Sequence, residues 1–299
     1  MDRLEAMSLL LAVVEAGSLS AASRKLRVPL PTISRKISEL EAHLNTRLLT
    51  RSTRKLALTD SGVTYVTAAK RILEEVSEAE RAASGERAAP RGDLVVTAPI
   101  VFGRLHVLPV VAEFLRQWPE INVRLVLSDR NLHLIDDHID IALRIGALAD
   151  SALAATRVGA VRRVVCGSPA YFAAHGVPKR PEDLAAMTAV TFDQFSSPEH
   201  WTFRDPRSKR DIRASVRSRL SVNTAEAAID GAAAGVGVTR VLSYQAAQAI
   251  LDRRIETVLA EYEPEPSPVS LIHGQQELTP LKVRMLLDFA APRLRARLA

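Results

Sequence analysis

The stretch that most constrains this chain is VPLPTISRKISELE, residues 28–41, where two prolines stand directly before a run with helical spacing. A proline inside a helix removes a backbone donor, but in the first turn that donor has no partner within the helix to lose. Pro29 is therefore predicted to close a turn, and Pro31 to lie in the first turn of a helix. The sequence predicts this helix over residues 31–44.

The predicted helix has two chemically different faces. At about 100° per residue, its apolar residues fall on one side and form a core face: Ile33, Ile37, Leu40 and Leu44. Arg35, Ser38 and Ala42 point the opposite way. A helix whose early exposed residues are short, polar and basic can enter the major groove of DNA N-terminus first, where its side chains reach base edges.

The residues around this helix complete a winged helix-turn-helix. A first helix is predicted over about 3–15, and Ser18 or Ser20 can cap a short second helix, LSAASRKL. After residue 44, two short apolar strands lie around Leu48–Leu49 and Leu56–Leu58. The basic tip RSTRK between them is typical of a β-hairpin wing that contacts phosphates or the minor groove.

Candidate DNA contacts follow from this arrangement. Arg35 can form a bidentate pair with guanine, and Thr32 or Ser34 can meet a base edge or a phosphate. The residues expected at the DNA interface come from the start of the second helix, the third helix and the wing: Ser18, Pro31, Thr32, Ser34, Arg35, Lys36, Arg51, Arg54 and Lys55. The alternative is an ordinary solvated helix face.

The positive charge of the chain gathers in the same segment. The net charge is +6 and the isoelectric point is near 9.8. Residues 24–55 hold nine Lys/Arg against two acids, whereas residues 91–299 hold 26 basic and 23 acidic side chains. A basic segment favours an acidic partner such as double-stranded DNA, although a solvated surface can reach this composition by chance.

Cysteine content and hydropathy indicate the cellular compartment of the protein. The single cysteine, Cys166, excludes an intramolecular disulfide, which fits a reducing environment. No apolar run reaches the ~18 residues of a membrane-spanning helix. The first residues have the spacing of an amphipathic helix with interspersed acids rather than the pattern of a signal peptide. We expect a cytoplasmic protein with no membrane partner.

The remainder of the chain changes character twice. A long helix is predicted over 59–84, with Thr59 as N-cap, and its apolar steps of three and four residues favour a short coiled coil over packing on its own domain. SGERAAPRGD, residues 84–93, indicates a linker. From residue 94, strands and helices alternate, which predicts an α/β fold with largely parallel sheets.

The segment VVEAGSLSAASRKLRVPLPTISRKISELEAHLNTRLLTRSTRKLALTDSG, residues 13–62, resembles the N-terminal domain of LysR-type transcriptional regulators. The shared features are the Gly-Ser start and Ala-Ala pair of the second helix, and Ser-Arg and Leu-Glu in the third. The Leu-Leu-x-Arg strand and the Leu-Thr-x-x-Gly opening of the long helix also match. Three positions depart, because many members have serine at Pro29, glycine at Asn45 and phenylalanine at Leu49.

The resemblance continues through GDLVVTAPIVFG, DIALRIGAL and EAAIDGAAAGVGVTRVLSY to the family's effector domain, which is similar to two-lobed periplasmic binding proteins. It implies a winged helix-turn-helix at 1–59, a dimerisation helix and hinge at 60–90, and a two-lobed α/β effector-binding domain at 91–299. It also implies a homodimer or homotetramer on a dyad promoter site, with RNA polymerase as a candidate partner. Where one subgroup has a glycine after the helix at 243–252, this chain has Arg253–Arg254.

The family further implies a small-molecule site between the lobes, at strand ends. By position, TAPIVFG opens a helix whose backbone N–H groups suit an anionic effector. Arg144 is the expected carboxylate partner, and an ion pair with an acid such as Asp140 is the alternative. The implied lining residues come from both lobes: Thr97, Pro99, Ile100, Phe102, Ser128, Arg144, Phe192, Asn223 and Thr224.

Other motifs favour structural roles. GAAAGVGVTR lacks the G-x-G-x-x-G spacing and follows a helix, so it indicates close helix–strand packing rather than a dinucleotide site. The histidines of HLIDDHIDI are poorly spaced for one helix face, which favours a polar turn over a metal site. Cys166 lies in an apolar strand and is predicted to be a buried small hydrophobe rather than a nucleophile. No cofactor is expected.

The helix-turn-helix pattern predicts a sequence-specific DNA-binding transcriptional regulator, not an enzyme, and the resemblance implies that a small-molecule effector modulates its activity. The alternative is a cytosolic ligand-binding protein or enzyme with an accessory nucleic-acid-binding domain. The seven histidines show no convincing catalytic constellation in the sequence. Turnover of a candidate ligand would favour the alternative.

Overall fold

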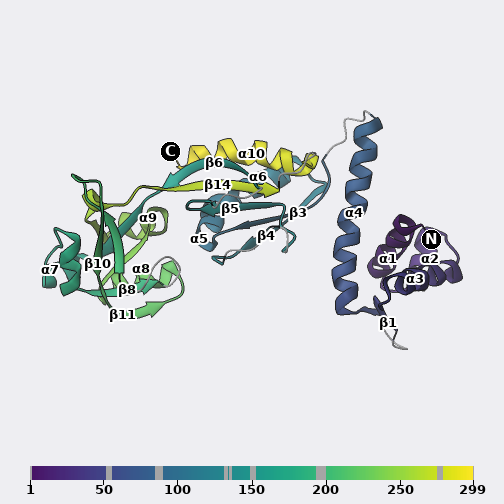
Figure 1. Cartoon of the computed structure of the whole chain (residues 1–299), viewed down its shortest axis with the longest axis horizontal. Coiled ribbons are helices and arrows are strands. Elements are labelled where there is room, and N and C mark those ends of the chain that lie inside the picture. Colours follow the sequence, from purple (N-terminus) through teal and green to yellow (C-terminus); the bar gives the residue numbers. More distant parts are fainter. Residues whose placement is uncertain are drawn as a thin grey trace. The chain divides into compact units, whose positions relative to one another are not determined.

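The computed structural model describes residues 2–51, 56–84, 90–130, 134, 137–148, 153–192, 200–274 and 279–298, without the side chains of 51, 78 and 81–84. The chain divides into two compact units, Met1–Ala89 and Pro90–Ala299 (Figure 1). The smaller unit holds the helix-turn-helix segment. The larger unit contains two five-stranded sheets, which define lobe I and lobe II.

The smaller unit is a winged helix-turn-helix followed by a long helix. Its described elements are α1 (Arg3–Ala16), α2 (Leu19–Leu26), α3 (Leu30–Leu44), β1 (Leu49–Arg51), β2 (Leu56–Leu58) and α4 (Asp60–Ser84). One apolar core joins them: Ala6, Leu9, Leu10, Val13, Ala22, Ile33, Ile37, Leu40, Leu48 and Leu49. The predicted helices and the antiparallel wing, β1–β2, are confirmed.

Within the described chain, no single helix is long and apolar enough to cross a membrane. Helices α1 and α2 are long and apolar enough to span a membrane only when they are taken together, and the chain bends by 114° between them. Their apolar residues form much of the core just described.

Helix α3 begins at Leu30, one residue before the predicted start, and Pro29 is its N-cap residue. The Pro29 carbonyl accepts the N–H of Thr32 at 2.9 Å, which begins the helical hydrogen bonds. Pro31 lies in the first turn as predicted, where its missing N–H removes no helical bond. The two prolines thus set a sharp start for α3.

The predicted faces of α3 are confirmed. Ile33, Ile37 and Leu40 are fully buried, whereas Arg35 and Ser38 are exposed. Burying a large aliphatic side chain stabilises a fold by about 1.5–3 kcal/mol. Three such anchors fix the rotation of α3 about its axis, and the exposed face follows from that rotation.

Helix α4 begins directly after Thr59, as predicted. The Thr59 hydroxyl accepts the N–H of Gly62 at 2.9 Å and donates to the Arg47 carbonyl at 2.7 Å. A side chain at Gly62 would place its Cβ 2.0 Å from the Leu48 carbonyl oxygen. The glycine of the Leu-Thr-x-x-Gly pattern is therefore required by close packing of the helix against the start of the wing.

Lobe I is a sheet with helices packed over it. Its elements are β3 (Gly92–Ala98), α5 (Ile100–Phe102), the π-helical segment η1 (Gly103–Val107), α6 (Leu108–Gln117), β4 (Ile121–Leu127), β5 (Ile141–Ile145), β6 (Leu153–Val161), β14 (Ser267–Gly274) and α10 (Leu281–Leu298). The strand order is β4-β3-β5-β14-β6. Helices α6 and α10 contribute Phe114 and Leu286 to a core shared with Leu143 of the sheet.

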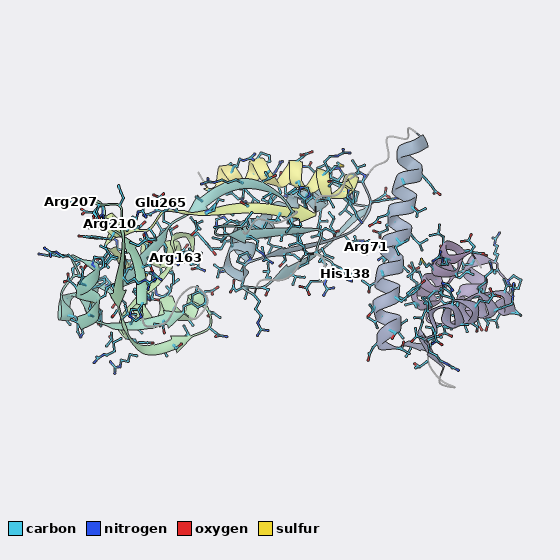
Figure 2. The ribbon with its side chains drawn as sticks, in the orientation of Figure 1. Arg71, His138, Arg163, Arg207, Arg210 and Glu265 are labelled. Atoms are coloured by element: carbon cyan, nitrogen blue, oxygen red, sulfur yellow. The ribbon has the colours of Figure 1, made fainter. Side chains whose placement is uncertain are left out.

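Lobe II has a second sheet and a hairpin. Its elements are β7 (Arg163–Gly167), α7 (Pro169–His175), the 3-10 segment η2 (Pro181–Ala186), β8 (Thr188–Phe192), β9 (His200–Arg204), β10 (Asp211–Ser215), β11 (Arg217–Val222), α8 (Ala225–Ala233), β12 (Val238–Leu242), α9 (Ser243–Leu251), β13 (Glu256–Val258) and the 3-10 segment η3 (Ala260–Tyr262). The strand order is β11-β8-β12-β7-β13, and β9 pairs with β10 alone. Arg207 and Arg210 lie in the turn of this hairpin (Figure 2).

Both large sheets are mixed, which corrects the expectation of largely parallel sheets. In lobe I, β3 is parallel to β4 and β5, but β14 is antiparallel to β5 and β6. In lobe II, β8 is parallel to β11 and β12, but β7 is antiparallel to β12 and β13. The physical reason is that the chain crosses between the lobes after β6 and again before β14.

An ion pair joins the two crossing segments. Arg162, between β6 and β7, donates from Nη1 to both carboxylate oxygens of Glu263, at 3.1 and 3.0 Å. Glu263 lies in the second crossing, and its side chain is only 12% exposed. The Ser243 N–H donates to the Arg162 carbonyl at 2.8 Å, so the start of α9 also holds the first crossing.

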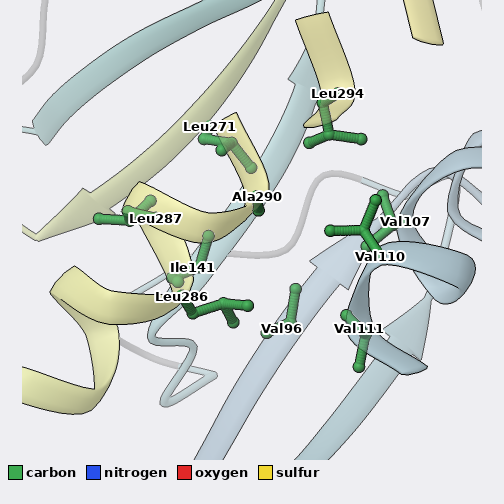
Figure 3. A pocket seen from close by; sticks show the side chains of 10 residues that line it. All are labelled: Val96, Val107, Val110, Val111, Ile141, Leu271, Leu286, Leu287, Ala290 and Leu294. Carbon is green, nitrogen blue, oxygen red and sulfur yellow. The ribbon is translucent and has the colours of Figure 1, made fainter. Parts of the chain in front are cut away.

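The core of lobe I contains a small apolar cavity of about 20 Å³ (Figure 3). Its walls come from the sheet, α6, α10 and the end of η1: Val96, Val107, Val110, Val111, Ile141, Leu271, Leu286, Leu287, Ala290 and Leu294. This space could hold about one water molecule, but the lining side chains offer no hydrogen-bond partner. The cavity is a packing gap rather than an effector site.

Candidate nucleic-acid interface and effector site

Helix α3 carries the candidate base-reading side chain. The side chain of Arg35 is 66% exposed, and its Nη1 donates to Glu39 Oε1 at 2.9 Å, one turn along the same face. A guanidinium has five N–H donors, so this bond leaves others for a base edge. The exposed face of α3 thus carries, near its start, a guanidinium that is held by its ion pair with Glu39.

Lys36 lies against α1 instead of projecting from the exposed face. Its ammonium pairs with Glu5 at 2.5 Å, and its side chain is 18% exposed. The sequence places Lys36 among the DNA contacts, but this ion pair engages its charge within the unit. In the observed arrangement Lys36 braces α3 on α1.

Other expected DNA contacts lie at two helix starts. Ser18 is the N-cap of α2, and its Oγ accepts the N–H of Ala21 at 3.1 Å. Pro31 is exposed, while Thr32 and Ser34 are half-buried in the first turns of α3. No described side chain caps α3, so its positive N-terminal end can accept a phosphate.

The wing is anchored by Glu41. Its Oε1 accepts two successive backbone N–H groups at residues 48 and 49, at 2.8 and 3.0 Å. Arg51 ends β1, and its side chain is outside the described atoms; Arg54 and Lys55 lie outside the described residues. The basic tip of the wing therefore stays a prediction from the sequence.

Three expected effector residues meet at neighbouring strand ends of lobe I. Thr97 on β3 is fully buried, and its hydroxyl donates to the Val126 carbonyl at 2.9 Å. The Ser128 N–H donates to the Ala98 carbonyl at 3.0 Å, which places Ser128 beside the end of β3. Arg144 lies on β5, the other neighbour of β3, and burial lowers the pKa of its guanidinium.

The start of α5 is occupied by a carboxylate of the protein. The N–H of Ile100 donates to Asp129 Oδ1 at 3.0 Å. An anionic effector was expected to use this kind of donor, so Asp129 now competes with it both for the N–H and by charge. Pro99 is half-buried beside this contact, and Ile100 is 39% exposed.

An aromatic cluster joins the two lobes. Phe102 is fully buried, and its ring centre lies 4.6 Å from that of His106 and 5.2 Å from that of Tyr244. Tyr244 belongs to α9 of lobe II, whereas Phe102 and His106 belong to lobe I. Phe102 therefore fills an inter-lobe contact and has no exposed surface for a ligand, which differs from the lining role expected from the sequence.

His106 is the least satisfied polar group of this cluster. Both of its ring nitrogens are buried without a hydrogen-bond partner among the described residues. Burial, and then the positive charge of Arg297, lower its pKa below the ordinary value. The ring is therefore neutral near pH 7. It lies in η1, a π-helical segment of the kind that often marks functional sites.

Lobe II brings its three expected residues together at two parallel strand ends. Phe192 ends β8 and pairs in register with Val222 at the end of β11. Asn223 follows and is exposed, and Thr224 is the N-cap of α8, with Oγ1 accepting the Ala227 N–H at 3.2 Å. The phenyl ring is half-buried against the lobe core.

Two half-buried arginines, Arg163 and Arg240, carry no signal in the sequence pattern. Arg240 on β12 lies over the rings of Trp201 and Phe203, at 5.3 and 6.0 Å, and donates to the Thr202 carbonyl at 3.0 Å. Burial, together with nearby Arg163, lowers the pKa of Arg240 to about 9. Cation–π contacts of this kind offset part of the cost of burial and hold the β9–β10 hairpin on the sheet.

The structural roles predicted for Cys166 and for the glycine-rich motif GAAAGVGVTR are confirmed. Cys166 is fully buried, and burial raises the pKa of its thiol to about 12, which makes it a poor nucleophile. A Cβ at Gly237 would lie 2.2 Å from the Thr188 carbonyl oxygen, so this glycine serves close packing. His133 and Asp136 lie outside the described residues, and the described ones contain no group of three or more His, Cys, Asp or Glu side chains that could hold a metal.

Matches to known protein families decide between a transcriptional regulator and a ligand-binding protein or enzyme with an accessory nucleic-acid-binding domain. Residues 4–63 match the family described as bacterial regulatory helix-turn-helix protein, lysR family. Residues 87–295 match the LysR substrate binding domain. The chain belongs to the LysR family. It is a DNA-binding transcriptional regulator with an effector-binding domain, as members of that family are.

Relatives and solved structures agree with this over nearly the whole LysR-type chain. An HTH-type transcriptional regulator of Xanthomonas campestris is 35% identical, covering 94% of this chain and 83% of the relative. The HTH-type transcriptional activator AaeR of Escherichia coli is 30% identical, with 96% and 93% covered. CrgA, a LysR-type transcriptional regulator from Neisseria meningitidis, matches at 30% identity and a TM-score of 0.60, with 97% and 98% covered. Full-length AphB from Vibrio cholerae matches at 26% identity and a TM-score of 0.60, with 96% and 98% covered.

The structure shows how three residues that depart from the usual LysR pattern fit their positions. Asn45 ends α3 with φ 51°, a left-handed conformation that glycine and asparagine adopt most readily. Leu49 is only 3% exposed, in the core position where phenylalanine is common. Arg253 follows the C-cap residue of α9 and has φ 56°, which explains why a glycine suits that position. Arg254 pairs with Asp230 at 2.7 Å.

Proposed function

We propose that this regulator reads a dyad promoter site with α3 in the major groove and responds to an acidic small molecule held in its larger unit. The observation that supports the first part is the division of α3 between three fully buried anchors and an exposed face carrying Arg35. Arg35 would pair with guanine, while Ser18, Thr32 and Ser34 would meet phosphates or base edges. The wing residues Arg51, Arg54 and Lys55 would add phosphate contacts.

Footprinting on the intergenic region beside the gene tests this reading. Two α3 helices in one oligomer would protect two inverted half-sites whose centres are about one helical turn, 10–10.5 base pairs, or a multiple of it apart. Protection of a single site without dyad symmetry would contradict the proposal. Such a complex would form in the cytoplasm, where RNA polymerase is the expected partner at the promoter.

Helix α4 would pair two chains into a homodimer, and further contacts would give a homotetramer. Val63 on this helix is 53% exposed, and Leu73 and Val76 are only half-buried within one chain. A helix with an incompletely covered apolar stripe favours self-association. Leu73→Glu should dissociate the oligomer in sedimentation velocity, whereas Thr67→Glu, an exposed position on the same helix, should leave it intact.

The effector would lie against the strand ends that hold Thr97, Ser128 and Arg144 in lobe I and Phe192, Asn223 and Thr224 in lobe II. Arg144 supports an acidic ligand, because it is half-buried and its pKa is lowered by burial, so a carboxylate would stabilise its charge. The start of α5 supports it less, because Asp129 already accepts the Ile100 N–H. We therefore assign recognition of the acid to Arg144 rather than to the helix start.

Thermal shift with a panel of mono- and dicarboxylic acids tests this assignment. A matching acid should raise the midpoint of the wild type, and Arg144→Gln should abolish the rise. Arg144→Lys, which keeps the charge but loses the two-pronged geometry, should keep a weaker rise. Arg284→Gln is the control, since Arg284 is exposed on α10. A shift that survives in Arg144→Gln would contradict the role of Arg144.

A further inference from the structure

Lobe II carries a second concentration of positive charge. Residues 200–221 hold seven Lys/Arg and two acids, a net charge of +5, while the rest of 91–299 holds 19 basic and 21 acidic residues. This segment covers β9, β10, β11 and the turns between them. The larger unit is therefore electrostatically uneven, with its positive charge gathered on one hairpin and one edge strand.

The hairpin separates an apolar face from a polar one. Trp201 pairs with Ala214 and Phe203 with Ile212, and these residues pack into the core of lobe II. The alternate positions form the outer face: His200, Thr202, Arg204, Asp211, Arg213 and Ser215. Since side chains alternate along a strand, the burial of the aromatic residues forces the basic and hydroxyl side chains outward.

The turn of the hairpin is fixed by one of the two acids. Asp205 Oδ1 accepts the N–H groups of Arg207 and Ser208 at 2.8 and 2.6 Å, and these bonds lower the pKa of its carboxyl. The other acid, Asp211, pairs with Arg204 at 3.2 Å. Both acids are thus engaged, one in shaping the turn and one in neutralising a single arginine.

Six basic side chains remain to give this surface its charge. Arg207 and Arg210 lie in the turn (Figure 2), and Lys209 lies between them in the sequence. Arg213 lies on β10, and Arg217 and Arg219 lie on the edge strand β11. All six are exposed, and none forms an ion pair with another described residue. The turn and β11 lie at opposite ends of lobe II in the view of Figures 1 and 2, so these charges are spread along the lobe. We call the six residues together the lobe II basic surface.

Its chemistry suits a phosphate backbone better than a protein surface. Five of the six are arginines, whose planar donors match phosphate oxygens, and exposed Thr202, Ser215 and His200 add further donors of the kind that bind phosphates. Protein interfaces depend on buried aromatic and apolar anchors. In residues 200–221 the aromatic side chains face inward, and Leu220 is the one large apolar side chain that is exposed.

We propose that the lobe II basic surface binds the phosphate backbone of duplex DNA that flanks the operator. The regulator would then hold its DNA at two places, through α3 and the wing at the operator and through lobe II outside it. These added contacts carry no sequence preference, because arginine–phosphate pairs do not read bases. They would strengthen binding to long DNA and make it more sensitive to salt.

The test uses the full chain and two operator fragments, one trimmed to the footprint of the α3 contacts and one with long flanks. The triple variant Arg207→Ala, Lys209→Ala, Arg210→Ala is compared with Arg116→Ala, Arg124→Ala, Arg284→Ala, which removes three exposed charges elsewhere on the same unit. On the long fragment, the slope of log K against log salt should become shallower by about 2–3 in the first variant only. On the trimmed fragment, all three proteins should bind alike.

Two results would overturn the proposal. Equal salt slopes for the wild type and the turn variant on the long fragment would show that this surface does not touch DNA, even if the variant then fails to activate RNA polymerase. An equal loss in the control variant would show a general charge effect. Neither result concerns the operator footprint itself, so a failure here is distinguishable from a failure of α3 to read DNA.

Discussion

The guanidinium of Arg35 and the carboxylate of Glu39 meet at 2.9 Å on the exposed side of α3. The two side chains are 66% and 38% exposed, so the pair stabilises the helix by only about 0.2–0.5 kcal/mol. We expect its larger effect to be on DNA binding. If Arg35 reads DNA, Glu39 would hold the guanidinium in one place and add a negative charge that repels phosphates away from the correct site.

Glu39→Gln should therefore relax specificity while tightening non-specific binding. We expect several-fold stronger binding to scrambled DNA and a ratio of operator to scrambled affinity that falls about tenfold, which corresponds to ~1.4 kcal/mol. Titration of both DNAs at one salt concentration measures this ratio. Glu15→Gln is the matched control, because Glu15 forms a similarly exposed ion pair with Lys25 that joins α1 to α2. A ratio equal to that of the wild type would leave Glu39 with a purely structural role.

His106 should make the larger unit sensitive to mild acid. Burial and Arg297 depress its folded pKa, so below about pH 6.5 the unfolded chain binds a proton that the folded chain resists. The stability contributed by neutral His106 is full above this pH and is lost as the pH falls from 6.5 towards the folded pKa. Asp129 and Glu226 act on neighbouring Tyr244 and do not remove this cost.

Melting curves between pH 8 and pH 5 check this effect. His106→Phe keeps an aromatic ring between Phe102 and Tyr244 and cannot be protonated, so its midpoint should fall less on acidification than that of the wild type. His200→Phe, at an exposed position on β9, should behave as the wild type does. Parallel pH profiles for the wild type and His106→Phe would rule out a role for this histidine.

Gly62→Ala should destabilise the smaller unit by about 1–3 kcal/mol, since the new Cβ would collide with the Leu48 carbonyl oxygen. Because that contact joins α4 to the wing, we also expect weaker DNA binding. Denaturant unfolding and operator titration measure the two effects. Ser61→Ala, at the exposed neighbouring position, should change stability by less than about 0.5 kcal/mol. Equal stability of both variants would show that α4 can shift to admit the methyl group.

The local elements of this regulator follow from sequence, because their signals are local. The prolines at 29 and 31, the spacing of Ile33, Ile37 and Leu40 and the cap at Thr59 each act within a few residues of the helix they define. Cys166 likewise lies in a short apolar run, and its burial follows from that run.

The lobe contacts do not follow from sequence, because their partners are distant along the chain. Arg162 and Glu263 are 101 residues apart, and Asp129 reaches Ile100 only when β3 and β4 lie side by side. The sequence pattern also does not predict strands β6, β8, β9 and β10, and the π-helical turn of η1 has no signature in residue spacing. The charge of residues 200–221 is hidden when it is averaged over the whole larger unit.

Arg253→Gly should stabilise lobe II by about 0.5–1 kcal/mol. The left-handed conformation at φ 56° costs a non-glycine residue roughly 1–2 kcal/mol, and the greater freedom of glycine in the unfolded chain offsets part of the gain. Arg254→Ala is the companion variant. It removes the 2.7 Å pair with Asp230 and should lower stability slightly, because both partners are exposed. Thermal unfolding of the wild type and both variants measures these changes in stability. A lower midpoint for Arg253→Gly than for the wild type would mean that the arginine side chain itself stabilises the turn.

The most direct measurement is the operator affinity of Arg35→Ala against that of Arg116→Ala, which removes an exposed charge from the other unit. If α3 reads DNA through Arg35, its loss should weaken operator binding by about 1–3 kcal/mol, with binding to scrambled DNA much less affected. The Arg116 variant should bind both as the wild type does. Operator affinity and footprint that persist unchanged in Arg35→Ala would contradict the account.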